Sequence, residues 1–285
     1  MELPNSEAIA TKLVYVSETG STNSDLIAAA ATGGESNWPD FSVYVTGYQN
    51  AGRGRSGRAW IAPAGSSLFV SVLVRRFDVP VENLGWLPLL AGLAMSRAVA
   101  GRLEASADSG SEFAIANVDR VGVKWPNDVL VGDKKISGVL SELLPDLSGV
   151  VIGAGLNLTL TPEQLPVDTA TSLAIVGDQD ALAAAGAAID AATLDDVLSR
   201  YLASLRELVG SLVAFRGNAA LAGLQGQVNA GCVSVGQEVR VILPGEQEVW
   251  GTAKSIDEQG RLLVETTSGT AMAVSAGDIV HLRHR

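Results

Sequence analysis

The sequence RVGVKWPNDVLVGDKKISGVLSELL, residues 120–144, predicts a strand, a turn and then a β-hairpin. Gly132 and Asp133 form a dipeptide typical of tight hairpin turns, between predicted strands at 129–131 and 135–144. Further strands are predicted by runs of β-forming residues at 13–16, 41–49, 67–76 and 149–160.

Helices alternate irregularly with these strands. The segment 83–102 is mostly apolar and predicts a well-buried helix, whereas 193–215 places its apolar residues at the 3.6-residue period of an amphipathic helix. The polar segment 104–119 between them predicts looser structure, and the alanine-rich stretch 178–192 has little pattern. The sequence therefore predicts helices together with strands that neighbour one another in a mixed or antiparallel sheet.

The texture of the sequence changes after Gly226. Short strands divided by Gly, Pro and acidic turns continue to the C-terminus, and this spacing is typical of a small β-barrel. We therefore predict two domains, at residues 1–224 and 225–285.

Composition excludes several function classes. The 285-residue chain is 47% hydrophobic, which is enough to form a hydrophobic core. Its net charge of -11 disfavours non-specific binding to DNA or RNA. Cys232 is the only cysteine, which disfavours disulfides and cysteine-rich zinc sites, and its apolar context predicts a buried thiol. The two histidines stand together at the C-terminus, which disfavours a histidine metal site and a Ser-His-Asp triad. No signal peptide and no apolar run of membrane-spanning length is evident, so we expect a cytoplasmic protein that binds no membrane.

A glycine- and arginine-rich segment, NAGRGRSGRAW at residues 50–60, contains a literal G-x-G-x-x-G. We call residues 50–60 the arginine loop. A dinucleotide-binding turn requires a helix directly after the third glycine, but Pro63 and Gly65 interrupt any helix there, and no Gly-Lys-Ser/Thr follows to make a P-loop. The segment instead predicts a loop that approaches a small anion closely, or a solvated basic loop.

A second group of polar residues lies in KWPNDVLVGDKKISG, residues 124–138. Pro126 favours an extended backbone at Trp125, so the Lys124 side chain should point away from Trp125. Two lysines and an aspartate near an arginine loop suit chemistry at a phosphate, with Asp128 as a candidate magnesium ligand. Ser21, Thr22 and Asn23 precede a predicted helix, where they suit either an N-cap or contacts to a ligand.

Taken in order, GRGRSGRAW, KWPNDVLV, KKISGVLSEL, VVIGAGLNL and the terminal GDIVHLR resemble the biotin–protein ligase family from about residue 13 to the end. The resemblance implies an α+β fold, in which the catalytic domain has a mixed β-sheet with helices on one face and a C-terminal SH3-like barrel follows. It also implies a two-step reaction. Biotin and ATP with Mg²⁺ give biotinyl-5′-AMP, and biotin then passes to a lysine of a biotin carboxyl carrier domain of acyl-CoA or pyruvate carboxylases.

The same resemblance implies roles for particular residues. Those expected to bind biotin are Ser21, Thr22, Asn23, Gln49, Arg53, Gly54, Arg55 and Lys135. Those expected near the nucleotide are Arg58, Trp60, Lys124, Asn127 and Asn157. Lys135, Arg55 and Asp128 are the expected catalytic residues, with Asp128 also the candidate for holding Mg²⁺ or for orienting the acceptor lysine.

Two other functions stay open on the sequence. A lipoate or octanoate ligase of the same broad fold is one, although the arginine loop together with KWPND fits biotin ligases better. A non-enzymatic binding module built around the small barrel is the other, and Lys135 beside the arginine loop argues against it. With about a dozen residues before the pattern begins and an acidic net charge, we expect no DNA-binding repressor function.

Overall fold

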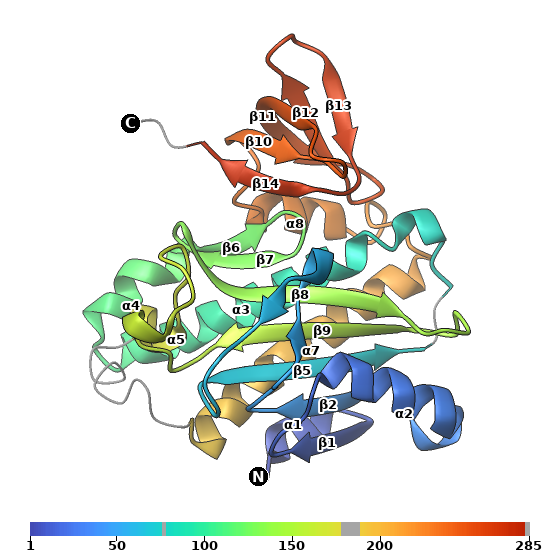
Figure 1. Cartoon of the computed structure of the whole chain (residues 1–285), viewed down its shortest axis with the longest axis vertical. Coiled ribbons are helices and arrows are strands. Elements are labelled where there is room, and N and C mark those ends of the chain that lie inside the picture. Colours follow the sequence, from blue (N-terminus) through green and yellow to red (C-terminus); the bar gives the residue numbers. More distant parts are fainter. Residues whose placement is uncertain (76–77, 178–188, 283–285) are drawn as a thin grey trace.

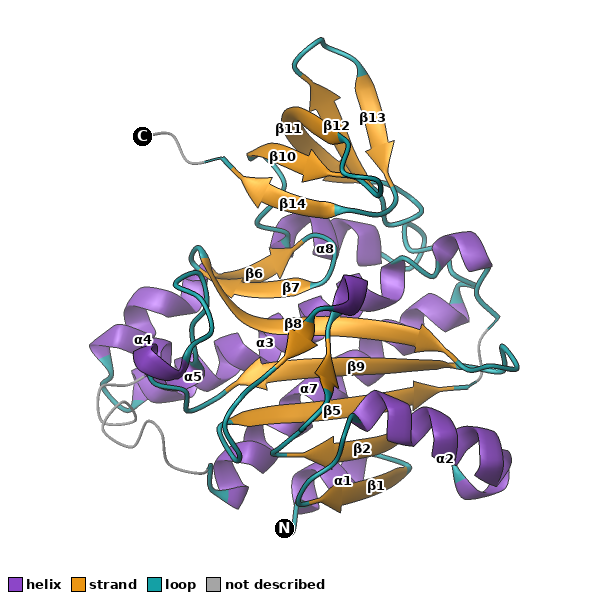
Figure 2. Ribbon diagram, viewed as in Figure 1, coloured by secondary structure: helices purple, strands orange, loops and turns teal. Residues whose placement is uncertain are grey.

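The computed structural model describes residues 1–75, 78–177 and 189–282, and a seven-stranded sheet forms its centre (Figures 1 and 2). The sheet order is β1-β2-β5-β9-β8-β7-β6. Its strands are β1 (Lys12–Val16), β2 (Ser42–Thr46), β5 (Ser67–Val74), β6 (Val121–Lys124), β7 (Asp128–Val131), β8 (Lys134–Leu143) and β9 (Val150–Asn157). β1 pairs with β2 in parallel and every other neighbour in this sheet pairs antiparallel, which confirms the predicted mixed sheet.

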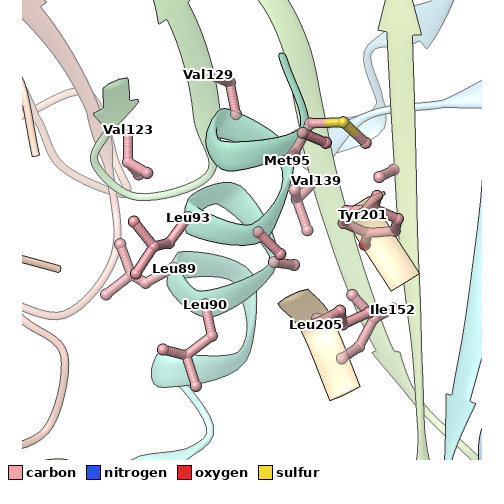
Figure 3. Close-up of a cluster of buried hydrophobic side chains, with 14 of the residues drawn as sticks. Leu89, Leu90, Leu93, Met95, Val123, Val129, Val139, Ile152, Tyr201 and Leu205 are labelled. Carbon is pink, nitrogen blue, oxygen red and sulfur yellow. The ribbon is translucent and has the colours of Figure 1, made fainter. Parts of the chain in front are cut away.

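Two long helices, α3 (Trp86–Asp108) and α7 (Ala191–Ala214), pack together behind one face of this sheet (Figures 1 and 3). Strand alternation supplies the apolar residues that meet them. Figure 3 shows part of this core, with side chains from α3 (Leu89, Leu90, Leu93, Met95), from the sheet (Val123, Val129, Val139, Ile152) and from α7 (Tyr201, Leu205).

The segment Val81–Asp108 is long and apolar enough to cross a membrane, which corrects the sequence-based statement that no such run exists. In this fold, however, 67% of its most apolar window is buried inside the protein, between the sheet and α7. Burial of this kind is what a core helix of an α+β domain requires. The apolar character of α3 is therefore explained by packing.

The opposite face of the sheet carries a third helix, α2 (Thr22–Asn37), so the helices do not all lie on one face. Leu26 and Ala30 of α2 pack on Leu73 and Val151, whose neighbours along each strand belong to the other core. α2 covers only part of this face. The uncovered part lies over strands β8 and β9, and the candidate site occupies it.

The polar segment 104–119 is more regular than the sequence predicts. α3 continues to Asp108, and a short helix, α4 (Glu112–Asn117), follows because the Ser111 side chain accepts a hydrogen bond from the Ala114 backbone N–H and caps it. α4 contacts α3 and α5 (Leu173–Gly177). Most of the alanine-rich stretch 178–192 lies outside the described residues.

The N-terminal helix α1 (Pro4–Ile9) is fixed to α7 by one buried carboxylate. Asp195 accepts hydrogen bonds from the backbone N–H groups of Asn5 and Ser6, both at 2.9 Å, and from the Ser6 hydroxyl at 2.6 Å. These N–H groups stand in the first turn of α1, where they have no partner within the helix. Asp195 therefore caps a helix from a position far away in the sequence.

We expect Asp195→Ala to lower the free energy of unfolding by about 2–4 kcal/mol, because it leaves buried donors without an acceptor. Asp196→Asn is the matched control. It removes an i,i+4 ion pair between Asp196 and Arg200 whose side chains are about 40% exposed, and should cost no more than about 0.5 kcal/mol. Urea unfolding measures both, and equal losses would contradict the capping role.

The C-terminal residues form the predicted small β unit, a five-stranded antiparallel sheet ordered β13-β12-β11-β10-β14. Its strands are β10 (Glu238–Ile242), β11 (Glu248–Ile256), β12 (Leu262–Thr266), β13 (Ala271–Val274) and β14 (Asp278–His281). α8 (Leu224–Gly231) lies between this sheet and α3. The predicted domain boundary between residues 224 and 225 falls at the start of α8, and it stays a prediction. The side chain of Trp125 links the two parts by donating to the Gly260 carbonyl.

Candidate active site

Every residue to which the sequence analysis gave a role lines one cavity of about 740 Å³. The cavity lies on the sheet face that α2 leaves uncovered, and residues of the C-terminal sheet form part of its wall. Glycines make its floor: a Cβ on Gly153 would lie 2.1 Å from Asn23 Oδ1, and a Cβ on Gly155 would lie 3.1 Å from the Trp60 ring. Cross-strand alternation places Gly138, Gly153 and Gly155 on this same face.

One end of the cavity is a network of short polar side chains at the start of α2. Ser21 caps the helix, and the backbone N–H and hydroxyl of Thr22 donate to Gln49 Oε1 at 2.7 and 3.0 Å. Asn23 accepts from the Ser71 hydroxyl at 2.6 Å and donates to the Leu140 carbonyl at 3.1 Å. An N-cap role and contact with a ligand are therefore compatible, since Ser21 caps the helix while Ser21, Thr22 and Asn23 all line the cavity.

Glu142 of β8 joins this network and the arginine loop, and the sequence analysis did not single it out. Its carboxylate accepts from Asn23 Nδ2 at 2.8 Å and forms an ion pair of 3.2 Å with Arg53. Strand alternation could have predicted this position. Glu142 follows Gly138 by four residues and Leu140 by two, so all three lie on the same face of β8.

The arginine loop is a small hairpin above the cavity. β3 (Gly52–Arg53) pairs with β4 (Ala59–Trp60), and the tip turns through Ser56 and Gly57, both with positive φ. Only glycine takes such a φ without strain, which explains why Gly57 stands there. Trp60 extends from β4 over the glycine floor, so the indole lies against Gly155 and Gly138.

The arginines of this loop are held by protein acceptors. Arg55 donates to Asn127 Oδ1 at 2.9 Å and to the Gly277 carbonyl at 3.2 Å. Arg58 donates to both carboxylate oxygens of Asp278, at 2.8 and 2.9 Å. Asp278 stands more than two hundred residues from the loop, so no local sequence pattern pointed to it.

Lys135 reaches the cavity because of an irregularity in β8. Leu130 pairs with Lys135 but Val129 pairs with Ser137, so a β-bulge at Ile136 shifts the register by one residue. A bulge re-aims side chains, and here Lys135 lies on the cavity side together with Gly138, three residues away. The Lys135 amine forms an ion pair of 2.7 Å with Asp128 and lies 5.3 Å from the centre of the Trp60 ring.

Lys124 and Asp128 face each other across the β6–β7 pair, beside Lys135. Burial is the largest influence on Lys124 and lowers its pKa, while the nearby Asp128 carboxylate opposes the change. The Trp125–Pro126 peptide between them is cis, and Trp125 is buried. Cys232 is buried as predicted, and burial raises the pKa of its thiol.

The described side chains around the cavity do not form a preassembled metal site. Within the described residues, no group of three or more His, Cys, Asp or Glu side chains is placed to hold a metal ion. Magnesium commonly uses one or two carboxylates together with substrate phosphates, so Asp128 fits it only as a partner of a bound nucleotide.

Comparison with known proteins agrees with this geometry. The model of the biotin/lipoate A/B protein ligase family matches residues 20–157, and that of the biotin protein ligase C-terminal domain matches residues 234–282. The biotin–[acetyl-CoA-carboxylase] ligase of Mycobacterium tuberculosis is 40% identical over 272 residues, covering 95% of this chain and 90% of that protein.

Solved structures show the same fold. Biotin protein ligase from Aquifex aeolicus in complex with biotin and ATP superposes with a TM-score of 0.66 and 27% identity, covering 96% of this chain and 100% of that chain. The Leishmania major biotin protein ligase in complex with biotinyl-5-AMP has a TM-score of 0.56 and 26% identity, with 93% and 99% covered. Sequence, fold and site thus agree, and the chain belongs to the biotin–protein ligase family.

Proposed function

We propose that this chain activates biotin with ATP and attaches it to a lysine of a biotin carboxyl carrier domain. In the first step a biotin carboxylate oxygen bonds to the α-phosphorus of ATP, the bond to pyrophosphate breaks, and biotinyl-5′-AMP forms. In the second step the lysine amine attacks the acyl carbon, AMP leaves, and an amide remains. The observation that carries the proposal is that one cavity brings together the polar network, Trp60 and Lys135, whose amine lies 5.3 Å from the centre of the Trp60 ring.

The polar network suits the ureido ring of biotin. Gln49 Oε1 is occupied by Thr22, which leaves the Gln49 amide nitrogen as a donor for the ureido oxygen. The Ser21 hydroxyl, which accepts from the Ser24 backbone N–H, keeps its own proton to donate. Asn23 is tied on both sides of its amide, so it holds the shape of the pocket as much as it contacts the ligand.

Lys135 would act where the two anions meet. Its ammonium can offset the negative charge of the carboxylate and of the α-phosphate as they approach, and Asp128 holds it in place. Arg55 and Arg58 would add positive charge above, with Trp60 as an apolar surface for the adenine and Asn157 at the cavity wall. Mg²⁺, when bound with ATP, would neutralise phosphate charge, and Asp128 is the residue that would hold it.

Carrier biotinylation tests the proposal directly. Purified protein, a carrier domain, biotin and Mg²⁺-ATP should give a carrier that a streptavidin blot detects, and omission of ATP should abolish the signal. The net charge of -11 supports a catalyst that does not bind DNA. We propose that it acts in the cytoplasm, where ATP is present. An unmodified carrier in the complete reaction would contradict the proposal.

The family description covers lipoate as well as biotin ligases, so substrate choice needs its own test. The donors at Gln49 and Ser21 match a ureido group, which lipoate lacks. We expect biotin at a hundred times its Kd to raise the melting temperature by about 5 °C, with no shift from lipoate at the same concentration. Stabilisation by lipoate alone would reverse the assignment.

A further inference from the structure

We propose that Asp278, the first residue of β14, is a positioning residue that latches the arginine loop over the cavity and thereby sets the affinity for ATP. The inference rests on the proposed function, because it assumes that Arg55 and Arg58 face a nucleotide. It assigns to the C-terminal sheet a part in substrate binding through one carboxylate.

The contacts of the loop tip carry the proposal. Arg58 makes a two-pronged pair with Asp278, and Arg55 Nη1 lies 3.9 Å from the same carboxylate. The adjacent Gly277 carbonyl accepts from Arg55 Nη2 at 3.2 Å. Asp278 and the residue just before β14 therefore hold both guanidinium groups of the tip.

The acceptors on the C-terminal sheet stand on fixed backbone. Asp278 pairs with Ile242 in the β10–β14 ladder, and Gly277 has φ 152°, with its Cα so close to Ile242 that an added Cβ would lie 2.7 Å from the carbonyl oxygen. Only glycine fits this position. The loop itself is far less supported, since its hairpin contains two residue pairs and its tip is exposed.

The two ends of the arginine loop are therefore held by different parts of the protein. Arg53 anchors the base of the loop to Glu142, and Asp278 anchors the tip. Without Asp278, the Arg58 side chain would have to be ordered by the nucleotide, and that ordering would weaken ATP binding. Arg55, which is expected to contact biotin, keeps its hydrogen bonds to Asn127 and the Gly277 carbonyl, so biotin binding should be little affected.

Asp278→Asn tests this, with Asp278→Glu as the charge-preserving variant and Glu248→Gln as the matched control. Glu248 forms a comparable exposed pair with Arg240 in the same sheet, at 2.8 Å, and does not line the cavity. Asp278→Asn should raise KM for ATP about three- to fivefold and leave KM for biotin unchanged. Asp278→Glu should restore most of the affinity, and Glu248→Gln should behave as the wild type.

A second readout needs no turnover. Trypsin cuts after arginine, so cleavage after Arg55 and Arg58 in the ligand-free protein, followed by mass spectrometry, reports loop opening. Cleavage should be faster in Asp278→Asn than in the wild type or Glu248→Gln, at equal melting temperatures. This comparison tests the latch even if the wild type fails to biotinylate a carrier.

A double variant separates positioning from general structure. If Asp278 acts through Arg58, Asp278→Asn should add little to KM for ATP once Arg58→Gln is present. Unchanged KM for ATP together with unchanged cleavage in Asp278→Asn would overturn the proposal. A lower KM for ATP would also overturn it, because Asp278 would then compete with the phosphates for the arginines.

Discussion

Lys135→Ala should lower the rate of biotinyl-adenylate formation about 10²–10³-fold, the cost typical of removing one charge-stabilising donor from an active site. The variant removes the amine that we propose to lie between the two substrates and leaves Asp128 without its partner at 2.7 Å. An unpaired carboxylate beside incoming phosphates adds repulsion to the loss of stabilisation. Biotin-dependent exchange of pyrophosphate into ATP measures this first step by itself.

Lys134→Ala is the control for this change. Lys134 is the preceding residue on β8, is exposed, and does not line the cavity, so its loss should leave exchange within twofold of the wild type. Lys135→Arg should recover part of the activity, because a charge remains although its shape differs. If Lys135→Ala exchanged as well as Lys134→Ala, the catalytic role assigned to Lys135 would be wrong.

Gly153→Ala should weaken biotin binding about 10–100-fold, because the floor of the cavity has no room for a methyl group. The added Cβ would lie 2.1 Å from Asn23 Oδ1 and 2.8 Å from its Cγ. Asn23 cannot yield easily, since Ser71, Leu140 and Glu142 hold its amide. Calorimetric titration with biotin measures the loss, alongside the melting temperature of the variant.

Gly155→Ala provides the matched comparison, two residues along the same strand face. Its Cβ would meet the Trp60 ring at 3.1 Å, which is closer to the predicted nucleotide end. We expect it to weaken ATP binding more than biotin binding, the reverse of Gly153→Ala. The same loss of biotin affinity in both variants would show that the floor is not divided between two ligands.

Much of this site could be predicted from the sequence because its chemistry is concentrated in short segments. The arginine loop, KWPND and the lysines after the hairpin each stand at a strand end or turn, and the sheet brings such ends together. The Gly132 turn and the strands that flank it made the antiparallel pairing in this region predictable. Glu142 was also within reach, by strand alternation from Gly138.

Other features depend on contacts that no local pattern encodes. The bulge at Ile136 decides on which side of the sheet Lys135 lies, and simple alternation from Ser137 would place it in the core. Asp278 meets Arg58 only because the C-terminal sheet packs beside the cavity. The regular structure at 104–119 depends on the Ser111 cap and on packing against α3, since its polar composition alone favours a loop.

A crystal structure of the protein with biotin and a non-hydrolysable ATP analogue tests the central claim most directly. We expect the biotin carboxylate and the α-phosphate both to lie within about 3 Å of Lys135 Nζ, in hydrogen-bonding range. We also expect the ureido ring at Gln49 and the arginine loop closed above both ligands. A ligand pair bound elsewhere, or Lys135 still paired only with Asp128 and touching neither anion, would contradict it.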